Sequence, residues 1–326
     1  MVVVPALIEG AALGVAMVPF LVHRWDMYRW DRDHRNEHRP KNTDHSERLT
    51  VLLPVWNEAT VIQKKLENLQ AQGLQVNMLI VDSASTDATV NLVRQWLEEN
   101  PKAFEQVEII EMSERKGKTA AVIQALTHLG QHADGLVCMT DADALLQPGC
   151  LKRMMQWFAD PMVGAVGAVP QRAQERPEER LHRDSWEAMR LAESMVDSTP
   201  FLEGSCMMWR PSCLAINELH PSANADDAQI ATSVRCRGWR AIADPMARFV
   251  DVAPSTLMGQ RRQKVRRAQG LQRLLIRQRK NATSRNQGLF GRIFRRQFHF
   301  HITAPLALTI GACLLYTSDA ADDRLS

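Results

Sequence analysis

The sequence predicts an α/β fold built on a mostly parallel sheet, and three observations lead to that prediction. From residue 49 onward, short β-rich runs alternate with helical stretches, the rhythm of parallel strands joined by crossover helices. The chain of 326 residues is 45% hydrophobic and 24% charged, so it can bury a sizeable core. Its six cysteines contain no Cys-x-x-Cys pair, which argues against a disulfide framework or a zinc site.

Four strands and three helices are expected in the first half of this domain. The strands are 49–56, 76–83, 107–112 and 135–140, and the helices are 58–72, 88–99 and 118–129. Ligands bind beyond the carboxyl ends of the strands in such sheets. Asp82 follows one of these ends, and Asp141 and Asp143 follow another, so we expect one shared site. Two carboxylates so close together repel each other, which indicates a bound cation.

The N-terminal segment is apolar. Residues 2–22 contain a single charge, Glu9, and are long enough to cross a bilayer core. Arginines, with Trp25, Tyr28 and Trp30, follow, which is typical of the cytoplasmic membrane interface. These features predict a transmembrane helix over 1–22, a charged juxtamembrane linker over 23–48 and an α/β domain over 49–256 on the cytoplasmic face of the cell inner membrane.

The C-terminal segment is basic, with 13 Lys and Arg and no acidic residue between Leu257 and Leu315. Over 288–302, apolar residues share one helical face and arginines the other, which predicts helices in the membrane interface over 257–301. Nucleic-acid binding is the alternative for so many basic residues, but an apolar run follows at 302–315, so no nucleic-acid partner is expected. That run is interpreted as the truncated start of a second transmembrane helix, and 314–326 as a non-native tail.

Three short motifs have both a structural and a functional interpretation. Taken alone, the turn after Asp82 is explained by helix capping, and nucleotide binding by Asp82 is the functional alternative. Lys116 and Lys118 lie at a predicted helix N-terminus, where they would either face solvent or meet phosphate. Asp226 and Asp227 open another predicted helix; the helix dipole accounts for one acid, and the second leaves room for a catalytic base.

Taken in order, seven motifs resemble those of the membrane-associated family 2 glycosyltransferases, which include cellulose, hyaluronan and poly-N-acetylglucosamine synthases. They are LPVWNE, VDSASTD, GKTAA, DAD, GSCMMWR, DDAQIA and QKVRR, between residues 49 and 271. The resemblance implies the GT-A fold, a Rossmann-like nucleotide-sugar-binding domain. It also implies an inverting transfer from a nucleoside-diphosphate sugar, expected to be a UDP-sugar, to a glycan or lipid-linked acceptor, with Mg²⁺ or Mn²⁺ as cofactor and membrane lipids as partners.

The same resemblance implies roles for individual residues. The donor nucleotide would be bound by Pro54, Asn57, Glu58, Asp82, Lys118 and Asp141, and the metal by Asp141 and Asp143. Asp227 would be the catalytic base. The acceptor side would hold Gly204, Arg210 and Asp226, and the diphosphate side Gln263 and Arg266.

Four positions depart from the family pattern. Ser83 stands where an acid is usual, Ala84 where glycine is usual, Ile123 where asparagine is usual and Arg267 where tryptophan is usual. That tryptophan is associated with polymer-making members, so processive synthesis and single sugar transfer both stay open. The departures also leave open a catalytically inactive family member that serves as a membrane-bound partner subunit.

Overall fold

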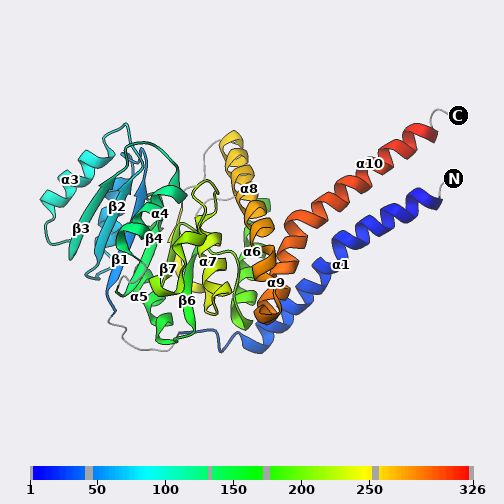
Figure 1. The fold of residues 1–326 in the computed structure, drawn as a ribbon, viewed down its shortest axis with the longest axis horizontal. Coiled ribbons are helices and arrows are strands. Elements are labelled where there is room, and N and C mark those ends of the chain that lie inside the picture. Colours follow the sequence, from blue (N-terminus) through cyan, green and yellow to red (C-terminus); the bar gives the residue numbers. More distant parts are fainter. Residues whose placement is uncertain (1–2, 41–46, 131–133, 172–176, 252–256, 323–326) are drawn as a thin grey trace.

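The structure, a computed structural model, describes residues 3–40, 47–130, 134–171, 177–251 and 257–322. An α/β body carries two long helices that project from it side by side, with both chain ends at the far tip (Figure 1). The predicted α/β fold class is therefore confirmed for the body.

The first half of the body follows the predicted order of elements. The parallel strands are β1 (Leu49–Val55), β2 (Asn77–Asp82), β3 (Gln106–Glu111) and β4 (Leu136–Thr140). The helices between them are α2 (Ile62–Gln70), α3 (Thr89–Glu99) and α4 (Lys118–Leu129). All four predicted strands and all three predicted helices are present, with bounds that differ by a few residues.

The second half turns the sheet into a mixed one, which corrects the prediction of a mostly parallel sheet. Its strands are β5 (Leu145–Leu146), β6 (Val163–Pro170), β7 (Cys206–Trp209) and β8 (Arg240–Val250). The order across the sheet is β3-β2-β1-β4-β7-β6-β8-β5. β7 runs antiparallel to β4 and to β6, and β5 runs antiparallel to β8.

Helices cover both faces of the sheet. One face buries apolar side chains of α2, α3 and α5 (Cys150–Gln156), and the other buries those of α4 and α7 (Asp226–Cys236). The central strands are buried on both faces, as expected for a sheet sandwiched between helices. Three layers therefore hold the strand ends rigidly in place.

The remaining helices lie at the β8 side of the body. They are α6 (Pro177–Val196), α8 (Leu257–Ala282), α9 (Gly288–Phe298) and, after a π-helical turn (His299–Thr303), α10 (Ala304–Asp322), which packs against α1 (Val3–His34). The two projecting helices approach closely, since a Cβ added to Gly311 would lie 3.1 Å from Cβ of Ala12. We call α1 and α10 together the helical hairpin.

The structure corrects three expectations for these outer segments. Within the described part of the chain, no helix is long and apolar enough to cross a membrane, so the transmembrane helices expected over 1–22 and from 302 are not found. The segment 23–34, expected as linker, continues α1. The apolar face of α9 does not face outward: Phe290, Ile293 and Phe294 are buried, and both phenylalanines pack with Leu274 and Leu275 of α8.

Candidate active site

The sequence-predicted acids gather where the direction of strand order reverses. β1 pairs with β2 on one side and with β4 on the other, which makes the carboxyl ends of these strands a topological switch point. Val55 lies beside Asp82 in the sheet register, and Asp141 directly follows β4. Pro54 is buried within β1, next to this edge.

A network of hydrogen bonds joins the two loops that follow β1 and β2. The Asn57 backbone N–H donates to Ser85 Oγ (2.9 Å), and the Thr86 N–H donates to Asn57 Oδ1 (2.8 Å). The Glu58 N–H donates to Thr89 Oγ1 at the start of α3 (2.8 Å). Asn57 has a left-handed φ of 53°, a conformation that asparagine tolerates better than most residues. The two loops thus form one rigid wall of the site.

Asp82 presents a buried carboxylate oxygen without a protein partner. Its Oδ2 accepts a hydrogen bond from the Ser85 N–H (3.0 Å), whereas Oδ1 is buried and has no hydrogen-bond partner in the described structure. The neighbouring Ser83 Oγ is in the same situation. Buried polar atoms are rarely left unpaired, so these two atoms mark a place where a polar ligand would complete the bonding.

The loop Asp141–Asp143 carries acids in a setting that favours a cation. Asp141 Oδ1 lies 2.6 Å from Lys118 Nζ. Asp143 is exposed, yet partial burial of its carboxyl, together with Asp141 and Asp251, raises its pKa. Burial, with Asp143 and Asp141 close by, also raises the pKa of Glu58 to about 7. A divalent ion would relieve the mutual repulsion of these acids.

The donor set fits a metal that is shared with a substrate. Within the described residues, no three His, Cys, Asp or Glu side chains are placed to enclose a metal ion by themselves. Mg²⁺ and its relatives bind through one or two carboxylates together with substrate phosphates. Asp141 and Asp143 would supply such oxygen ligands, and the missing ligands would come from a diphosphate.

A second acid pair lies at the N-terminus of α7. Asp227 Oδ2 accepts the Gly204 N–H (3.0 Å) and its Oδ1 accepts the Ala228 N–H (2.7 Å). Burial, followed by the negative charge of Asp226, raises the pKa of Asp227 to about 7. A Cβ at Gly204 would lie 3.1 Å from Asp227 Oδ2, so only glycine fits here without a shift of the carboxylate.

Lys118 connects the two acid pairs. Its Nζ lies 2.6 Å from Asp141 Oδ1 and 3.5 Å from Asp226 Oδ2, and it donates to the Gly204 carbonyl (3.1 Å). These acids hold the pKa of Lys118 well above its ordinary value despite burial. Asp141 of the predicted donor side therefore meets Gly204 and Asp226 of the predicted acceptor side around one ammonium group.

The structure does not bring three predicted residues into this site. Arg210 lies at the opposite end of the sheet, beyond the Val137–Trp209 pair, where it forms an ion pair with Glu47 (2.8 Å). It also donates to the Phe158 carbonyl, which makes it a structural clamp. Gln263 and Arg266 lie on α8, where Arg266 is exposed. For neither side chain does the described structure show a bond to the site acids.

Two features of the site were missed by sequence reasoning. The Arg115 guanidinium lies 3.3 Å from the centroid of the Trp56 ring, directly beside Asn57. The negative charge of Asp251 contributes to the raised pKa of Asp143. The two residues come close because β8 pairs with β5, which places Val250 opposite Leu145. Trp56 within the LPVWNE motif was a usable signal. For Asp251 there was none, since strand pairing between distant segments is not written in local sequence.

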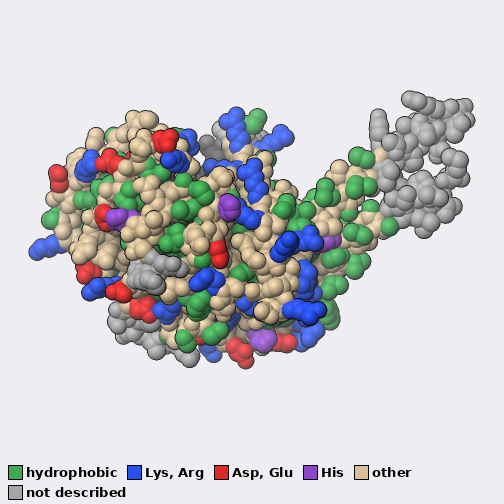
Figure 2. Space-filling model, viewed as in Figure 1, with side chains coloured by type: hydrophobic (Ala, Val, Ile, Leu, Met, Phe, Trp, Pro, Cys, Tyr) green, Lys and Arg blue, Asp and Glu red, His purple; other side chains and the backbone are tan. Residues whose placement is uncertain are grey.

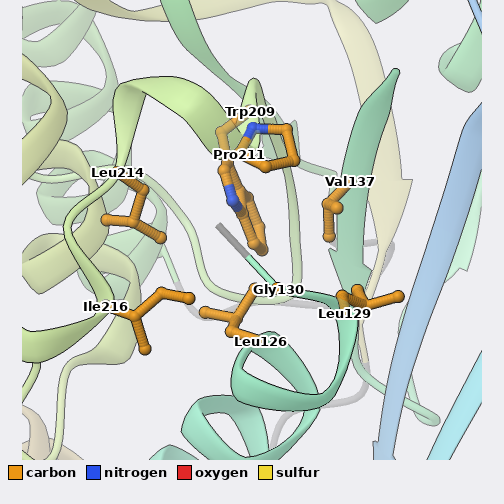
Figure 3. A pocket seen from close by; sticks show the side chains of 8 residues that line it. All are labelled: Leu126, Leu129, Gly130, Val137, Trp209, Pro211, Leu214 and Ile216. Atoms are coloured by element: carbon orange, nitrogen blue, oxygen red, sulfur yellow. The ribbon is translucent and has the colours of Figure 1, made fainter. Parts of the chain in front are cut away.

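The structure also contains an apolar hollow (Figure 3). It is lined by Leu126, Leu129, Gly130, Val137, Trp209, Pro211, Leu214 and Ile216. Val137 and Trp209 pair at the far end of β4 from Asp141, and none of the described residues that line the hollow has a titratable side chain. We therefore assign the functional site to the strand ends and not to this hollow.

Comparison with known families agrees with this geometry. Residues 50–213 match Glycosyl transferase family 2, and residues 136–318 match Glycosyl transferase family group 2. The chain belongs to glycosyl transferase family 2. The resemblance to family 2 glycosyltransferases that the ordered motifs indicated is therefore confirmed, which supports the prediction of an enzyme.

Among curated proteins, the chain is 24% identical over 244 residues to poly-β-1,6-N-acetyl-D-glucosamine synthase of Staphylococcus aureus strain COL, covering 72% of this chain and 57% of that protein. It thus spans little more than half the length of that relative. Glycosyltransferase AglE of Haloferax volcanii is 29% identical over 122 residues, which is 36% of this chain and 38% of that protein.

Two solved structures share the fold. The mannosyltransferase PcManGT from Pyrobaculum calidifontis, solved with GDP-Man and Mn²⁺, superposes with a TM-score of 0.81 at 30% identity, over 97% of this chain and 87% of that one. TarS 1–349 of S. aureus with UDP-GlcNAc gives a TM-score of 0.55 at 14% identity, over 78% of this chain and 73% of that one. The GT-A-like fold is thereby established.

Proposed function

We propose that this chain is an inverting, metal-dependent glycosyltransferase that moves a sugar from a nucleoside-diphosphate sugar to an acceptor hydroxyl. One observation carries the proposal: Lys118 forms ion pairs with one member of each acid pair, Asp141 of Asp141/Asp143 and Asp226 of Asp226/Asp227. Asp141/Asp143 would bind a metal ion, and Asp226/Asp227 would accept a proton. The donor and acceptor of a sugar would meet between them.

The donor side follows from the atoms that lack partners. Asp82 Oδ1 and Ser83 Oγ are buried without a hydrogen-bond partner among the described residues. A bound nucleoside would supply the missing hydrogen bonds. PcManGT was solved with GDP-Man and Mn²⁺, and TarS with UDP-GlcNAc, which supports a nucleotide-sugar donor and Mn²⁺ or Mg²⁺. A UDP-sugar is our first choice, as the family resemblance implies, and a GDP-sugar, the kind of donor bound by PcManGT, is the second.

The chemistry is a single displacement. Asp227 takes the proton of the acceptor hydroxyl while that oxygen attacks the anomeric carbon. The bond from this carbon to the diphosphate oxygen breaks, and the electron pair leaves with the nucleoside diphosphate, so the anomeric configuration inverts. Lys118 lies where negative charge develops on the leaving group and stabilises it. A divalent ion held by Asp141 and Asp143 would add Lewis-acid stabilisation of the same charge.

We also propose that the acceptor is a glycan or lipid-linked sugar at the cytoplasmic membrane face. The helical hairpin supports this, since Leu13, Val18, Leu21, Leu306 and Ile310 expose about half or more of their surface. Figure 2 shows hydrophobic side chains along the hairpin, with Lys and Arg side chains near its base. An apolar surface with a basic rim suits anionic lipids. Flotation with and without anionic vesicles tests this; a chain that stays unbound would contradict it.

The first experiment measures nucleoside diphosphate release from a panel of UDP- and GDP-sugars with Mn²⁺, Mg²⁺ or EDTA. We expect release that requires the metal, and Asp143→Asn should reduce it by about 10²-fold or more, since a metal ligand is lost. Asp134→Asn is the matched control, an exposed acid before the same strand, and should retain full activity. Metal-independent release, or equal loss in both variants, would contradict the proposal.

A further inference from the structure

A fully buried lysine lies directly beneath the acid loop. Lys65 of α2 has no solvent-exposed surface, whereas lysine is almost never fully buried unless it is paired. Burial lowers its pKa to about 8, which nearby thiols and then Asp141 and Asp143 partly oppose. Within the described residues, no carboxylate forms an ion pair with it. So costly a group requires a reason for its position.

The ammonium reaches both ends of the loop that carries Asp141 and Asp143. Lys65 Nζ donates to Thr140 Oγ1 (2.8 Å), immediately before Asp141, and to the Ala144 carbonyl, immediately after Asp143. Two of its three donors are thereby used on opposite ends of one short loop. Lys65 thereby holds both ends of the loop, and we call these two hydrogen bonds the clamp.

The contact continues into the strand that carries the acceptor side. Thr140 Oγ1 donates to the Ser205 carbonyl (2.9 Å), and the Asp141 N–H donates to the same oxygen (3.2 Å). Ser205 follows Gly204, whose N–H holds Asp227. Lys65 is therefore linked, through Thr140 and Ser205, to both halves of the site.

We propose that Lys65 is a positioning residue of the donor site, which fixes the Asp141–Asp143 loop in the one conformation that binds a metal–diphosphate. The inference rests on the proposed function for the ligand, but not for the clamp itself. Because the ammonium touches neither carboxylate directly, it acts through the backbone of the loop. A buried hydrophobic residue in its place would fill the space but leave the loop ends free.

The positive charge of Lys65 makes the two possible effects on cation affinity opposite in sign. Removing a positive charge near two carboxylates would, by electrostatics alone, strengthen cation binding. Releasing the loop would weaken it, since ligands held in the wrong place lose affinity. Weaker binding in a variant without the charge therefore reports the loss of position.

The matched control lies one helical turn away. Asn68, also on α2, exchanges two hydrogen bonds with Leu146: its Nδ2 donates to the Leu146 carbonyl (2.9 Å), and its Oδ1 accepts the Leu146 N–H (2.8 Å). Asn68→Ala thus removes a similar link between the same helix and the same stretch of chain, but outside the acid loop.

The experiment combines hydrogen–deuterium exchange with Mn²⁺ titration in the presence of UDP and of GDP. In Lys65→Met we expect faster exchange confined to the amides of 141–144 and a rise of about tenfold in the Mn²⁺ dissociation constant. Asn68→Ala should lose a similar amount of thermal stability and keep the wild-type Mn²⁺ affinity. Thr140→Val, which removes the shared hydroxyl, should move both readouts in the same direction as Lys65→Met.

Each result decides the question. Unchanged exchange at 141–144 in Lys65→Met overturns the clamp, whatever the enzyme binds. Faster exchange with unchanged or tighter Mn²⁺ binding overturns the positioning role. If Lys65→Met does not fold, Thr140→Val decides on the same two criteria. If the wild-type chain binds no Mn²⁺–nucleotide, the proposed function fails, while the exchange data still decide whether Lys65 holds the loop.

Discussion

Two pairs of aspartates of identical chemistry lie in contrasting surroundings. Asp141 and Asp143 lie on a loop, with the Asp143 side chain open to solvent. Asp226 and Asp227 begin a helix, where Asp227 accepts two backbone N–H groups and Asp226 is buried. The first pair suits a metal cation that is bound by several oxygen atoms, and the second pair suits the transfer of a single proton. The surroundings of an acid, more than the acid itself, therefore set its role.

The largest effect is expected from removing the proton acceptor. Asp227→Asn should lower kcat for sugar transfer by roughly 10²–10⁴-fold, because the acceptor hydroxyl then keeps its proton. The affinity for a Mn²⁺–nucleotide should stay at the wild-type value, since the first pair is untouched. Steady-state kinetics and calorimetric titration measure the two quantities.

Asp226→Asn is the matched control for that prediction. It removes a charge from the same helix turn but leaves Asp227 in place, so its loss of kcat should be much smaller. If both variants lost kcat equally, or if Asp227→Asn also lost metal–nucleotide affinity, the two pairs would not have separate roles.

A second prediction concerns the pH dependence of catalysis. Asp227 acts in its deprotonated form, so with a pKa raised to about 7 by burial, kcat should rise with pH through neutrality. The positive charge of Lys118 lowers the pKa of Asp227. Lys118→Met should therefore shift the rise of kcat to higher pH, by roughly one pH unit, and reduce kcat several-fold at pH 7. The profile of kcat against pH at saturating donor measures the shift.

Lys116→Met provides the comparison for that shift. Lys116 is two residues away and forms an exposed ion pair with Glu114 (2.9 Å), so its removal should leave the rise of kcat at the same pH. If the rise of kcat shifted along the pH axis in both variants, or shifted to lower pH in Lys118→Met, the assignment of Asp227 as the titrating base would be contradicted.

The sequence predicted the half of the site that is local. Strand ends and helix starts follow from short-range periodicity and capping, so Asp82, Asp141 and the start of α7 at Asp226 were found in advance. The meeting of the two acid pairs was expected only from the family resemblance. In the structure it depends on β7, whose pairing with β4 brings Ser205 to Asp141.

What escaped prediction depends on distant pairing. β6 is buried along its whole length, so its sequence shows no alternation that would separate a strand from a buried helix. The amphipathic pattern over 288–302 predicted a helix in the membrane interface; the helix α9 is present, but its apolar face packs against α8. Arg210 fits its motif, yet its position beyond Trp209 takes it to the wrong end of β7.

The smallest effect concerns backbone strain beside each acid pair. Ala84, near Asp82, and Ala225, directly before Asp226, have left-handed φ values of 56° and 73°, which L-residues adopt at a cost of roughly 1–2 kcal/mol. Glycine relieves this but loses about 0.5–1 kcal/mol of chain entropy. Ala84→Gly should therefore raise the free energy of unfolding by about 0.5–1 kcal/mol, as measured by the urea midpoint.

Ala225→Gly should give less, because the Ala225 methyl packs against the cluster of Phe201, Leu274 and Phe290, and its loss costs about 0.8 kcal/mol. The control is Ala120→Gly inside α4, where φ is helical and glycine should cost about 1 kcal/mol. Equal gains at positions 84 and 225 would mean that packing at Ala225 contributes nothing. A loss at position 84 would mean that this turn holds no strain, and that the glycine usual there in the family serves another purpose.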